Sequence, residues 1–242
     1  MIIAQKTDEW GQVCQVRSAG ASLRLYTDGI FHSQYHPHRL LEGNLWDLLW
    51  LPSLLQPQQS IKRVLVLGVG GGAVVRKLNR LYPWALIVGV DLSQVHLALA
   101  RRYFGVRGGH MPLYCADAVA FMKYYRGPGF DLIIDDLFSG SAGEPERVLP
   151  MDRAWCRVLT QHLQPNGLLV ANFGSHEEYK QSAMASTAEG FHSGYTLQMP
   201  QYENIFAACY LSEVRNGAAL MATRLANYGV KLGDCVNIKA VF

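Results

Sequence analysis

The chain has 242 residues, of which 50% are hydrophobic and 17% are charged, and its formal net charge is +3. This composition supports a sizeable buried core and argues against an intrinsically disordered chain. The small net charge argues against a nucleic-acid-binding protein, since such proteins concentrate far more positive charge.

The cysteines favour a reduced, cytoplasmic protein. There are five of them, widely spaced and without a C-x-x-C pair: Cys14, Cys115, Cys156, Cys209 and Cys235. This pattern fits free thiols better than a disulfide framework or a metal site. The most apolar stretch, residues 45–55, is interrupted by Asp47 and Pro52 and is too short to cross a bilayer. We therefore expect a cytoplasmic protein with no membrane segment.

The first part of the chain is expected to form a small β region. VCQVR (13–17) and SLRLYTDG (22–29) have strand-like composition around turn-rich sequence. A helix is predicted at 40–51, ended by Pro52. We place the boundary of this region near residue 55, so that 1–55 is a small N-terminal β region with a linking helix and 56–242 is a second domain.

From Arg63 onward, apolar strands alternate with helices. The strands are expected at 64–68, 85–91, 112–117, 130–136 and 167–173. Continuously apolar strands separated by helices indicate a parallel sheet covered on both faces. After a helix predicted at 176–190, the segments 195–199 and 204–214 flank the turn-prone PQYE and suggest a hairpin. The prediction is a seven-stranded sheet with five parallel strands and an antiparallel pair.

A glycine-rich loop follows the first of these strands. GVGGGA (68–73) precedes a predicted helix and matches G-x-G-x-x-[GA] through Gly68, Gly70 and Ala73. Glycines allow a ligand to approach the backbone N–H groups at the helix N-terminus. The motif lacks the Lys-Ser/Thr of a phosphate-binding P-loop. It predicts a nucleotide-like ligand; the alternative is a tight turn that only packs the helix on the strand.

Three carboxylates stand at the ends of neighbouring strands. Asp91 is placed to accept the ribose hydroxyls, and Asp117 to accept the exocyclic amine of adenine. Each has an alternative role as a helix N-cap, although Ser93 could cap the helix after Asp91. With Asp136 they suit a ligand that carries ribose, adenine and a cationic centre, as S-adenosylmethionine does. A dinucleotide would instead need partners for its pyrophosphate.

These motifs together resemble the spermidine synthase (polyamine aminopropyltransferase) family, whose fold is the class I S-adenosylmethionine-dependent methyltransferase-like, Rossmann-like α/β fold. The resemblance runs through LRLYTDGIFHS, the glycine loop, VGVD, CADAVAFM, FDLIIDDLFSG, LQPNGLLVANFGS and MPQY. It implies a pocket for S-adenosylmethionine or its decarboxylated form. The residues assigned to that pocket are Gly68, Gly70, Gly71, Gly72, Asp91, Leu92, Asp117, Ala118 and Asp136.

Two adjacent acids end the fourth strand. Because side chains alternate along a strand, Asp136 should face the crevice and Asp135 the opposite side. The family usually has a small or apolar residue at the position of Asp135, which we interpret as a capped or ion-paired structural acid. Asp136 is the candidate catalytic residue.

Other positions depart from the family pattern. The second acid of the family's D-x-x-D motif, a base for the attacking amine, falls on Ser139, and the acid of its glycine loop falls on Gly71. A glycine there would admit the carboxylate of intact S-adenosylmethionine. The family's Tyr-His pair falls on Asn44 and Leu45, and its frequent Gln on His32.

These departures make methyl transfer from S-adenosylmethionine to a small acceptor the favoured hypothesis, because it needs no amine base. The alternatives are aminopropyl transfer from decarboxylated S-adenosylmethionine and a catalytically silent cofactor-binding protein, while an NAD oxidoreductase ranks far behind. The acceptor side is assigned to His32, Tyr35, Ser139 and Tyr202. His36 and His38 have no third ligand nearby, so we expect no metal site. The N-terminal strands could pair two copies into a homodimer.

Overall fold

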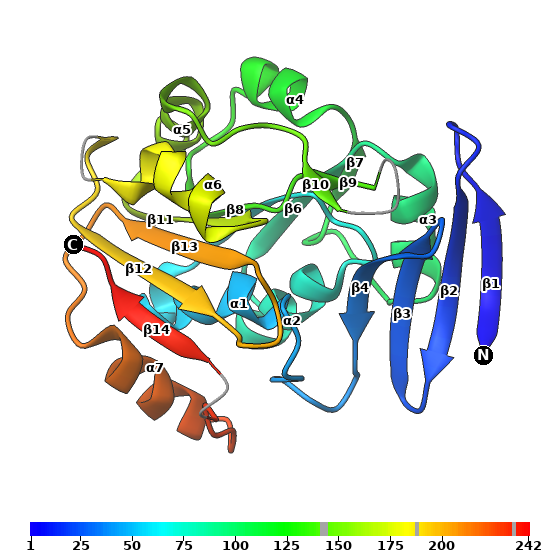
Figure 1. Cartoon of the computed structure of the whole chain (residues 1–242), viewed down its shortest axis with the longest axis horizontal. Helices are drawn as coiled ribbons and strands as arrows, with labels where there is room; N and C mark the ends of the chain where they lie inside the picture. The colour runs from blue at the N-terminus through cyan, green and yellow to red at the C-terminus, as the bar shows by residue number, and fades with distance from the viewer. Residues whose placement is uncertain (141–144, 187–188, 234–235) are drawn as a thin grey trace.

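The computed structural model describes residues 1–140, 145–186, 189–233 and 236–242. Cys235 lies outside the described residues. A small antiparallel sheet at the N-terminus stands beside a large mixed sheet that carries helices on both faces (Figure 1). The division into two domains at residue 55 stays a prediction.

The small sheet has four strands in chain order. They are β1 (Ile2–Thr7), β2 (Val13–Ala19), β3 (Ser22–Thr27) and β4 (Ile30–Tyr35). Its inner face buries Cys14, Val16 and Leu25, which pack in one cluster with Leu99 and Phe104. These two residues belong to the part of the chain that forms the large sheet and its helices, which we call the large domain for brevity. This shared apolar cluster holds the small sheet against the large domain.

The helix predicted at 40–51, in the segment between the two sheets, is shorter than expected. Helix α1 covers only Asp47–Trp50 and continues as the 3-10 helix η1 (Leu51–Leu55), in which Pro52 is part of the first turn. The Asp47 carboxylate accepts hydrogen bonds from the backbone N–H groups of residues 42, 43 and 44. Gly43 has φ +74°, so the chain bends into a loop where helical turns were expected.

The large sheet has eight strands in the order β14-β12-β13-β11-β8-β5-β6-β7. Their bounds are β5 (Arg63–Leu67), β6 (Leu86–Asp91), β7 (Leu113–Cys115), β8 (Phe130–Asp135), β11 (Leu163–Phe173), β12 (Ser193–Gln198), β13 (Ile205–Tyr210) and β14 (Asn237–Ala240). Strands β7, β6, β5, β8 and β11 run parallel, and β13 and β12 are antiparallel, as predicted. Strand β14 was not predicted, because three of its four residues are exposed and no apolar pattern marks it.

Helices cover both faces of this sheet. They are α2 (Ala73–Leu81), α3 (Gln94–Arg102), α4 (Ala118–Tyr124), α5 (Arg153–Thr160), α6 (His176–Gln181) and α7 (Gly217–Ala226), with the short 3-10 helices η2 (Gln58–Ser60) and η3 (Ala183–Ala185). The helix expected at 176–190 is thus shorter, and α7 was not predicted. Val64 and Val66 of β5 face one core cluster and Leu65 and Leu67 the other. In the described parts of the chain, no helix has the length and apolar character needed to cross a membrane.

A short two-stranded element follows β8. Strands β9 (Phe138–Ser139) and β10 (Glu146–Arg147) pair antiparallel, and we call residues 137–140 and 145–149 the flap. The flap stands at the carboxyl ends of the parallel strands, where open α/β sheets bind their ligands.

Candidate functional site

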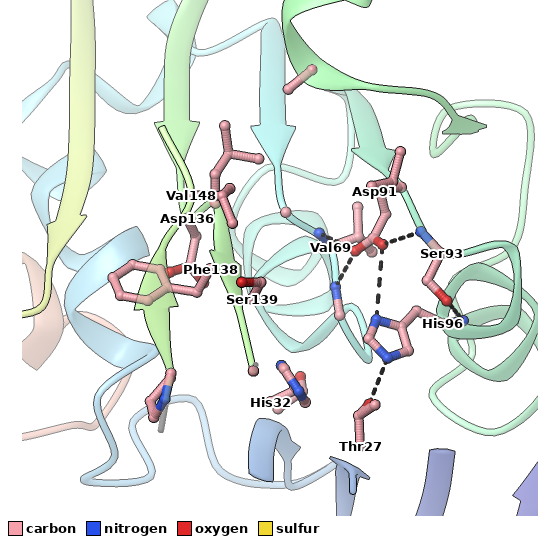
Figure 2. Close-up of a pocket in the computed structure, with 18 of the residues that line it drawn as sticks. Thr27, His32, Val69, Asp91, Ser93, His96, Asp136, Phe138, Ser139 and Val148 are labelled. Atoms are coloured by element: carbon pink, nitrogen blue, oxygen red, sulfur yellow. Dashed lines mark hydrogen bonds and ion pairs between the residues drawn. The ribbon is translucent and has the colours of Figure 1, made fainter. Parts of the chain in front are cut away.

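A cavity of about 520 Å³ lies between the carboxyl ends of the parallel strands and the small sheet. This volume is in the range of a small-molecule site. Its walls come from the glycine loop, the ends of β6, β7, β8 and β11, strand β4, the loop before α1 and the flap. Figure 2 shows Asp91 and Asp136 on opposite sides, with His32 of the small sheet between them.

Only part of the glycine loop faces this cavity. Gly68 and Gly70 line it, with φ values of +86° and +50°. A Cβ at Gly71 would lie 2.9 Å from Phe104 and Ser33, and one at Gly72 would lie 2.5 Å from Val106. Neither residue lines the cavity. Gly71 was predicted to face the ligand, but it faces the protein interior instead. A side chain at this position would meet Phe104.

The Asp91 carboxylate connects the glycine loop to the end of β6 through hydrogen bonds. It accepts hydrogen bonds from the backbone N–H groups of Val69 (2.9 Å), Gly70 (2.8 Å) and Ser93 (2.9 Å) (Figure 2). Ser93, and not Asp91, caps helix α3 by accepting from the His96 N–H at 3.2 Å. A carboxylate offers about four acceptor sites, so one remains for a ligand hydroxyl.

Two histidines connect this end of the cavity to the small sheet. His96 Nδ1 lies 3.8 Å from Asp91 Oδ1, and its Nε2 shares a 2.8 Å hydrogen bond with the Thr27 hydroxyl. The ring of His32 lies 5.4 Å from that of His96. Burial, and then the neighbouring His96, lower the pKa of His32 to about 4, so His32 is neutral near pH 7. Its Nε2 is buried without a hydrogen-bond partner among the described residues.

Asp117 has the alternative N-cap role and still lines the cavity. Its carboxylate accepts a 2.8 Å hydrogen bond from the Ala120 N–H and caps helix α4, and the residue also lines the cavity. Leu92 and Ala118 line the same part of the cavity. The N-cap role therefore does not remove Asp117 from the site.

Asp136 has a different environment from the other carboxylates. It accepts a 2.8 Å hydrogen bond from the side-chain amide of Asn172, whose oxygen in turn accepts a 3.0 Å bond from Asn204. Burial raises the pKa of Asp136 to about 6, and the adjacent Asp135 adds to this rise against the opposing effects of Asn172 and Arg147. Sequence analysis missed Asn172 and Asn204; the position of Asn172 near the end of β11 was the only signal.

Asp135 points to the opposite side of the sheet and is fully buried. It accepts a 2.6 Å hydrogen bond from Trp155 Nε1 and pairs with Arg147 of the flap at 2.8 Å. Arg147 also donates to the backbone oxygen of Asn172 at 2.5 Å. The interpretation of Asp135 as an ion-paired structural acid is confirmed, and its partner fixes the base of the flap.

Known proteins resemble this chain in both sequence and fold. The family model of the spermine/spermidine synthase domain matches residues 48–213. The chain belongs to this family. It is 31% identical over 143 residues to the polyamine aminopropyltransferase of Vibrio vulnificus, which covers 58% of this chain and 47% of that protein. It is 25% identical over 168 residues to the eEF1A lysine and N-terminal methyltransferase homolog of Drosophila pseudoobscura, covering 64% of this chain and 25% of that one.

A solved structure supports the fold over nearly the whole chain. A probable spermidine synthase from Corynebacterium glutamicum superposes with a TM-score of 0.76 at 19% identity, covering 98% of this chain and 90% of that one. This confirms the predicted Rossmann-like, methyltransferase-like fold. The alignments to the Vibrio and Drosophila proteins span about half or less of their length.

Four residues are assigned to the acceptor side from the sequence, and the structure separates them. His32 and Ser139 line the cavity. Tyr35 does not; its ring packs beside the side chains of Arg76 and Lys77. Tyr202 is also outside the cavity wall and interacts with the backbone of the loop before α1. The structure adds residues that were not assigned to the site from the sequence: Phe31, Trp46, Phe138 and Asn204.

Proposed function

We propose that this protein transfers an aminopropyl group from decarboxylated S-adenosylmethionine to an amine acceptor. The observation that carries this proposal is the charge of the cavity. Its described walls hold four carboxylates and no lysine or arginine; the acids are Asp8, Asp91, Asp117 and Asp136. The decarboxylated donor has a sulfonium and an ammonium but no carboxylate, so all its charges are favourable here.

The cavity has the groups that such a donor needs. We assign one ribose hydroxyl to the remaining acceptor site of Asp91 and the adenine amine to Asp117. We assign the cationic part to Asp136, on the opposite side of the cavity (Figure 2). The family match and the similarity to an aminopropyltransferase support this choice over methyl transfer, which sequence analysis favoured.

The reaction also needs a proton acceptor. The amine nitrogen must be neutral to attack the aminopropyl carbon, forming a C–N bond while the C–S electron pair returns to the sulfur. The sulfonium thus becomes the neutral thioether of 5′-methylthioadenosine, and the surplus proton on nitrogen passes to Asp136. Because its pKa is raised to about 6, Asp136 is a stronger base than an ordinary aspartate yet still ionised near pH 7. Asn172 holds the carboxylate in place.

Methyl transfer from S-adenosylmethionine remains a second candidate. The observation that favours it is Ser139, which lines the cavity where the family pattern has an acid. A hydroxyl has too high a pKa to act as an amine base. Both reactions would use the same nucleoside pocket. They differ in the group that the acceptor receives, which is methyl in one and aminopropyl in the other.

The test is to supply each donor with a panel of amines and to measure the nucleoside product by mass spectrometry. We expect 5′-methylthioadenosine from the decarboxylated donor. S-adenosylhomocysteine from the intact donor would instead establish methyl transfer. If calorimetry shows donor binding but neither product forms with any amine, the protein is a silent binder and the proposal fails.

We also propose a homodimer in the cytoplasm, formed through the small sheet. Strand β1 is the edge of that sheet and exposes Ile2 and Ile3. Unpaired edge strands with apolar side chains favour pairing with another chain. A monomeric mass in light scattering would contradict the dimer.

A further inference from the structure

The two ends of the cavity have different walls. We call the end that contains Asp91 and Asp117 the nucleoside end and the end that contains Asp136 the acceptor end. At the nucleoside end, the turn between β1 and β2 reaches helix α3, where Glu9 accepts a 3.0 Å hydrogen bond from the Gln94 N–H. Asp8 belongs to this turn, so its charge lies at the nucleoside end. The other end contains Asp136 with Asn172 and Asn204.

Aromatic and aliphatic side chains form the wall at the Asp136 end. The rings of Phe31 and Trp46 meet edge-to-face at 4.7 Å, and Leu45 lines the cavity beside them. The backbone of Leu45 interacts with Tyr202, two residues before the Asn204 that binds Asn172. This contact connects the loop before α1 to the segment that carries Asn204, which is hydrogen-bonded through Asn172 to Asp136.

The flap closes the same end. A Cβ at Gly140 would lie 2.3 Å from the Ile30 side chain, so the flap touches strand β4 next to Phe31. Phe138 of the flap adds a further aromatic ring to the cavity lining. The acceptor end is therefore enclosed by the apolar side chains of Phe31, Leu45, Trp46 and Phe138, with the uncharged Ser139 beside them.

Two acids, Glu42 of the loop before α1 and Asp47 at the start of α1, are turned away from this wall. Glu42 is buried and pairs with Lys77 at 2.7 Å. Asp47 is buried too; it accepts the loop's backbone N–H groups and a 3.1 Å hydrogen bond from Trp50 Nε1. The loop thus presents Leu45 and Trp46 to the cavity. At this end, Asp136 is the only charged residue among the described lining residues.

We propose that the acceptor is a monoamine with an alkyl or aryl body, and not a diamine or polyamine. This inference rests on the proposed aminopropyl transfer. A diamine would press its second ammonium against an apolar wall with no counter-charge, which strongly disfavours binding. A monoamine places its nitrogen at Asp136 and its body on Phe31, Leu45 and Trp46. The unpartnered Nε2 of His32 supplies a neutral hydrogen-bonding group between the two ends.

The first test compares acceptors in the unaltered protein. With decarboxylated S-adenosylmethionine as donor, kcat/KM is measured for n-hexylamine, 2-phenylethylamine and 1,4-diaminobutane by the release of 5′-methylthioadenosine. We expect the monoamines to exceed the diamine by at least about tenfold, the cost of one unpaired charged group. Equal values, or a preference for the diamine, would overturn the inference and leave aminopropyl transfer intact.

A binding measurement separates this inference from the proposed function. Calorimetric titration of n-hexylamine and 1,4-diaminobutane into protein saturated with 5′-methylthioadenosine needs no turnover. If no amine yields product, the proposed function fails, while tighter binding of hexylamine still supports the apolar amine site. If both bind equally, the acceptor inference fails whatever the reaction.

A pair of variants tests the wall itself. Leu45 is half-buried, so a smaller polar side chain fits there, and Leu45→Asp adds a carboxylate where the second ammonium of a diamine would lie. We expect the ratio of diamine to monoamine kcat/KM to rise at least about tenfold. The matched variant Leu45→Asn has the same shape without the charge and should leave the ratio within about threefold of the parent value. Equal shifts in both variants, or none in Leu45→Asp, would contradict the proposal.

Discussion

The two ends of the cavity differ in how their polar groups are satisfied. At the nucleoside end, Asp91 accepts three backbone N–H groups and His96 is hydrogen-bonded to Thr27. At the acceptor end, Asp136 has a single side-chain amide as its described partner, and His32 Nε2 has none. The carboxylate and the imidazole of the first end are held by hydrogen bonds within the protein. The second holds polar groups whose needs a ligand would complete.

This difference has a consequence for chemistry. The Asp91 carboxylate is occupied by three backbone N–H groups, so its described contacts hold the glycine loop. A buried carboxylate with few donors binds a proton more readily, as the raised pKa of Asp136 shows. In the proposed reaction, binding and proton transfer therefore belong to different aspartates, which differ in their surroundings.

Replacing the acid at the acceptor end should have the largest effect. Asp136→Asn keeps the shape and the contact with Asn172 but removes the base, so we expect kcat to fall by about 10²–10⁴-fold. The calorimetric Kd for the donor should change by less than about tenfold, since Asp91 and Asp117 remain. A variant that keeps most of its turnover would show that the proton leaves by another route.

Removing the Asp135–Arg147 ion pair at the base of the flap should give the next largest effect, a loss of stability. Arg147→Met leaves the fully buried Asp135 without its ion-pair partner, and we expect the free energy of unfolding to fall by about 3–5 kcal/mol. Arg153→Met is the matched control: that side chain is 73% exposed and pairs loosely with Glu189, so about 0–1 kcal/mol is expected. Urea denaturation measures both.

A second substitution distinguishes charge from packing at this position. In the double variant Asp135→Asn with Arg147→Met, the unpaired charge is gone and Trp155 keeps an oxygen acceptor. Much of the lost stability should return. If the double variant is as unstable as Arg147→Met alone, the loss comes from packing against Phe173, whose ring lies 5.3 Å from the Arg147 guanidinium.

The raised pKa of Asp136 at the acceptor end predicts that the stability of the protein depends on pH. The pKa of Asp136 is about 6 in the folded protein and 3.8 for an ordinary aspartate, so between these values the folded protein holds more protons than the unfolded chain. The Asp136 contribution to the free energy of unfolding therefore falls as pH rises from about 4 to 6, by about 1–3 kcal/mol. Asp136→Asn removes this fall and should be more stable than the parent protein at pH 8, with little gain at pH 4. A gain that is independent of pH would contradict the assignment.

Much of the large domain could be predicted from sequence because its signals are local. Strands buried on both faces give continuous apolar runs, so the five parallel strands were found, and alternation along β8 separated Asp135 from Asp136. The glycine motif gave the position of the loop but not the direction of Gly71, which Phe104 and Ser33 determine from distant segments.

The acceptor end was harder to predict because it depends on contacts between segments far apart. Asn172 and Asn204 lie 32 residues apart and act through one side-chain hydrogen bond. The loop at 42–46 was predicted to be the start of a helix. Its actual shape depends on hydrogen bonds from its backbone N–H groups to the Asp47 carboxylate, which leave no recognisable pattern in the sequence. The apolar acceptor wall exists only when this loop meets Phe31 of the small sheet.

The smallest expected effect tests whether the small sheet tunes the nucleoside end. Thr27→Val has nearly the same shape but loses the 2.8 Å hydrogen bond to His96, whose other nitrogen faces Asp91. Losing one such bond costs about 1 kcal/mol, so the Kd of the donor should rise about threefold to tenfold while kcat stays unchanged. Thr223→Val, on the exposed face of α7 with its hydroxyl bonded to the Ala219 carbonyl, should leave Kd as it is. If Thr27→Val instead lowers kcat at constant Kd, the small sheet acts on the reacting groups, and the division between a binding end and a reactive end is wrong.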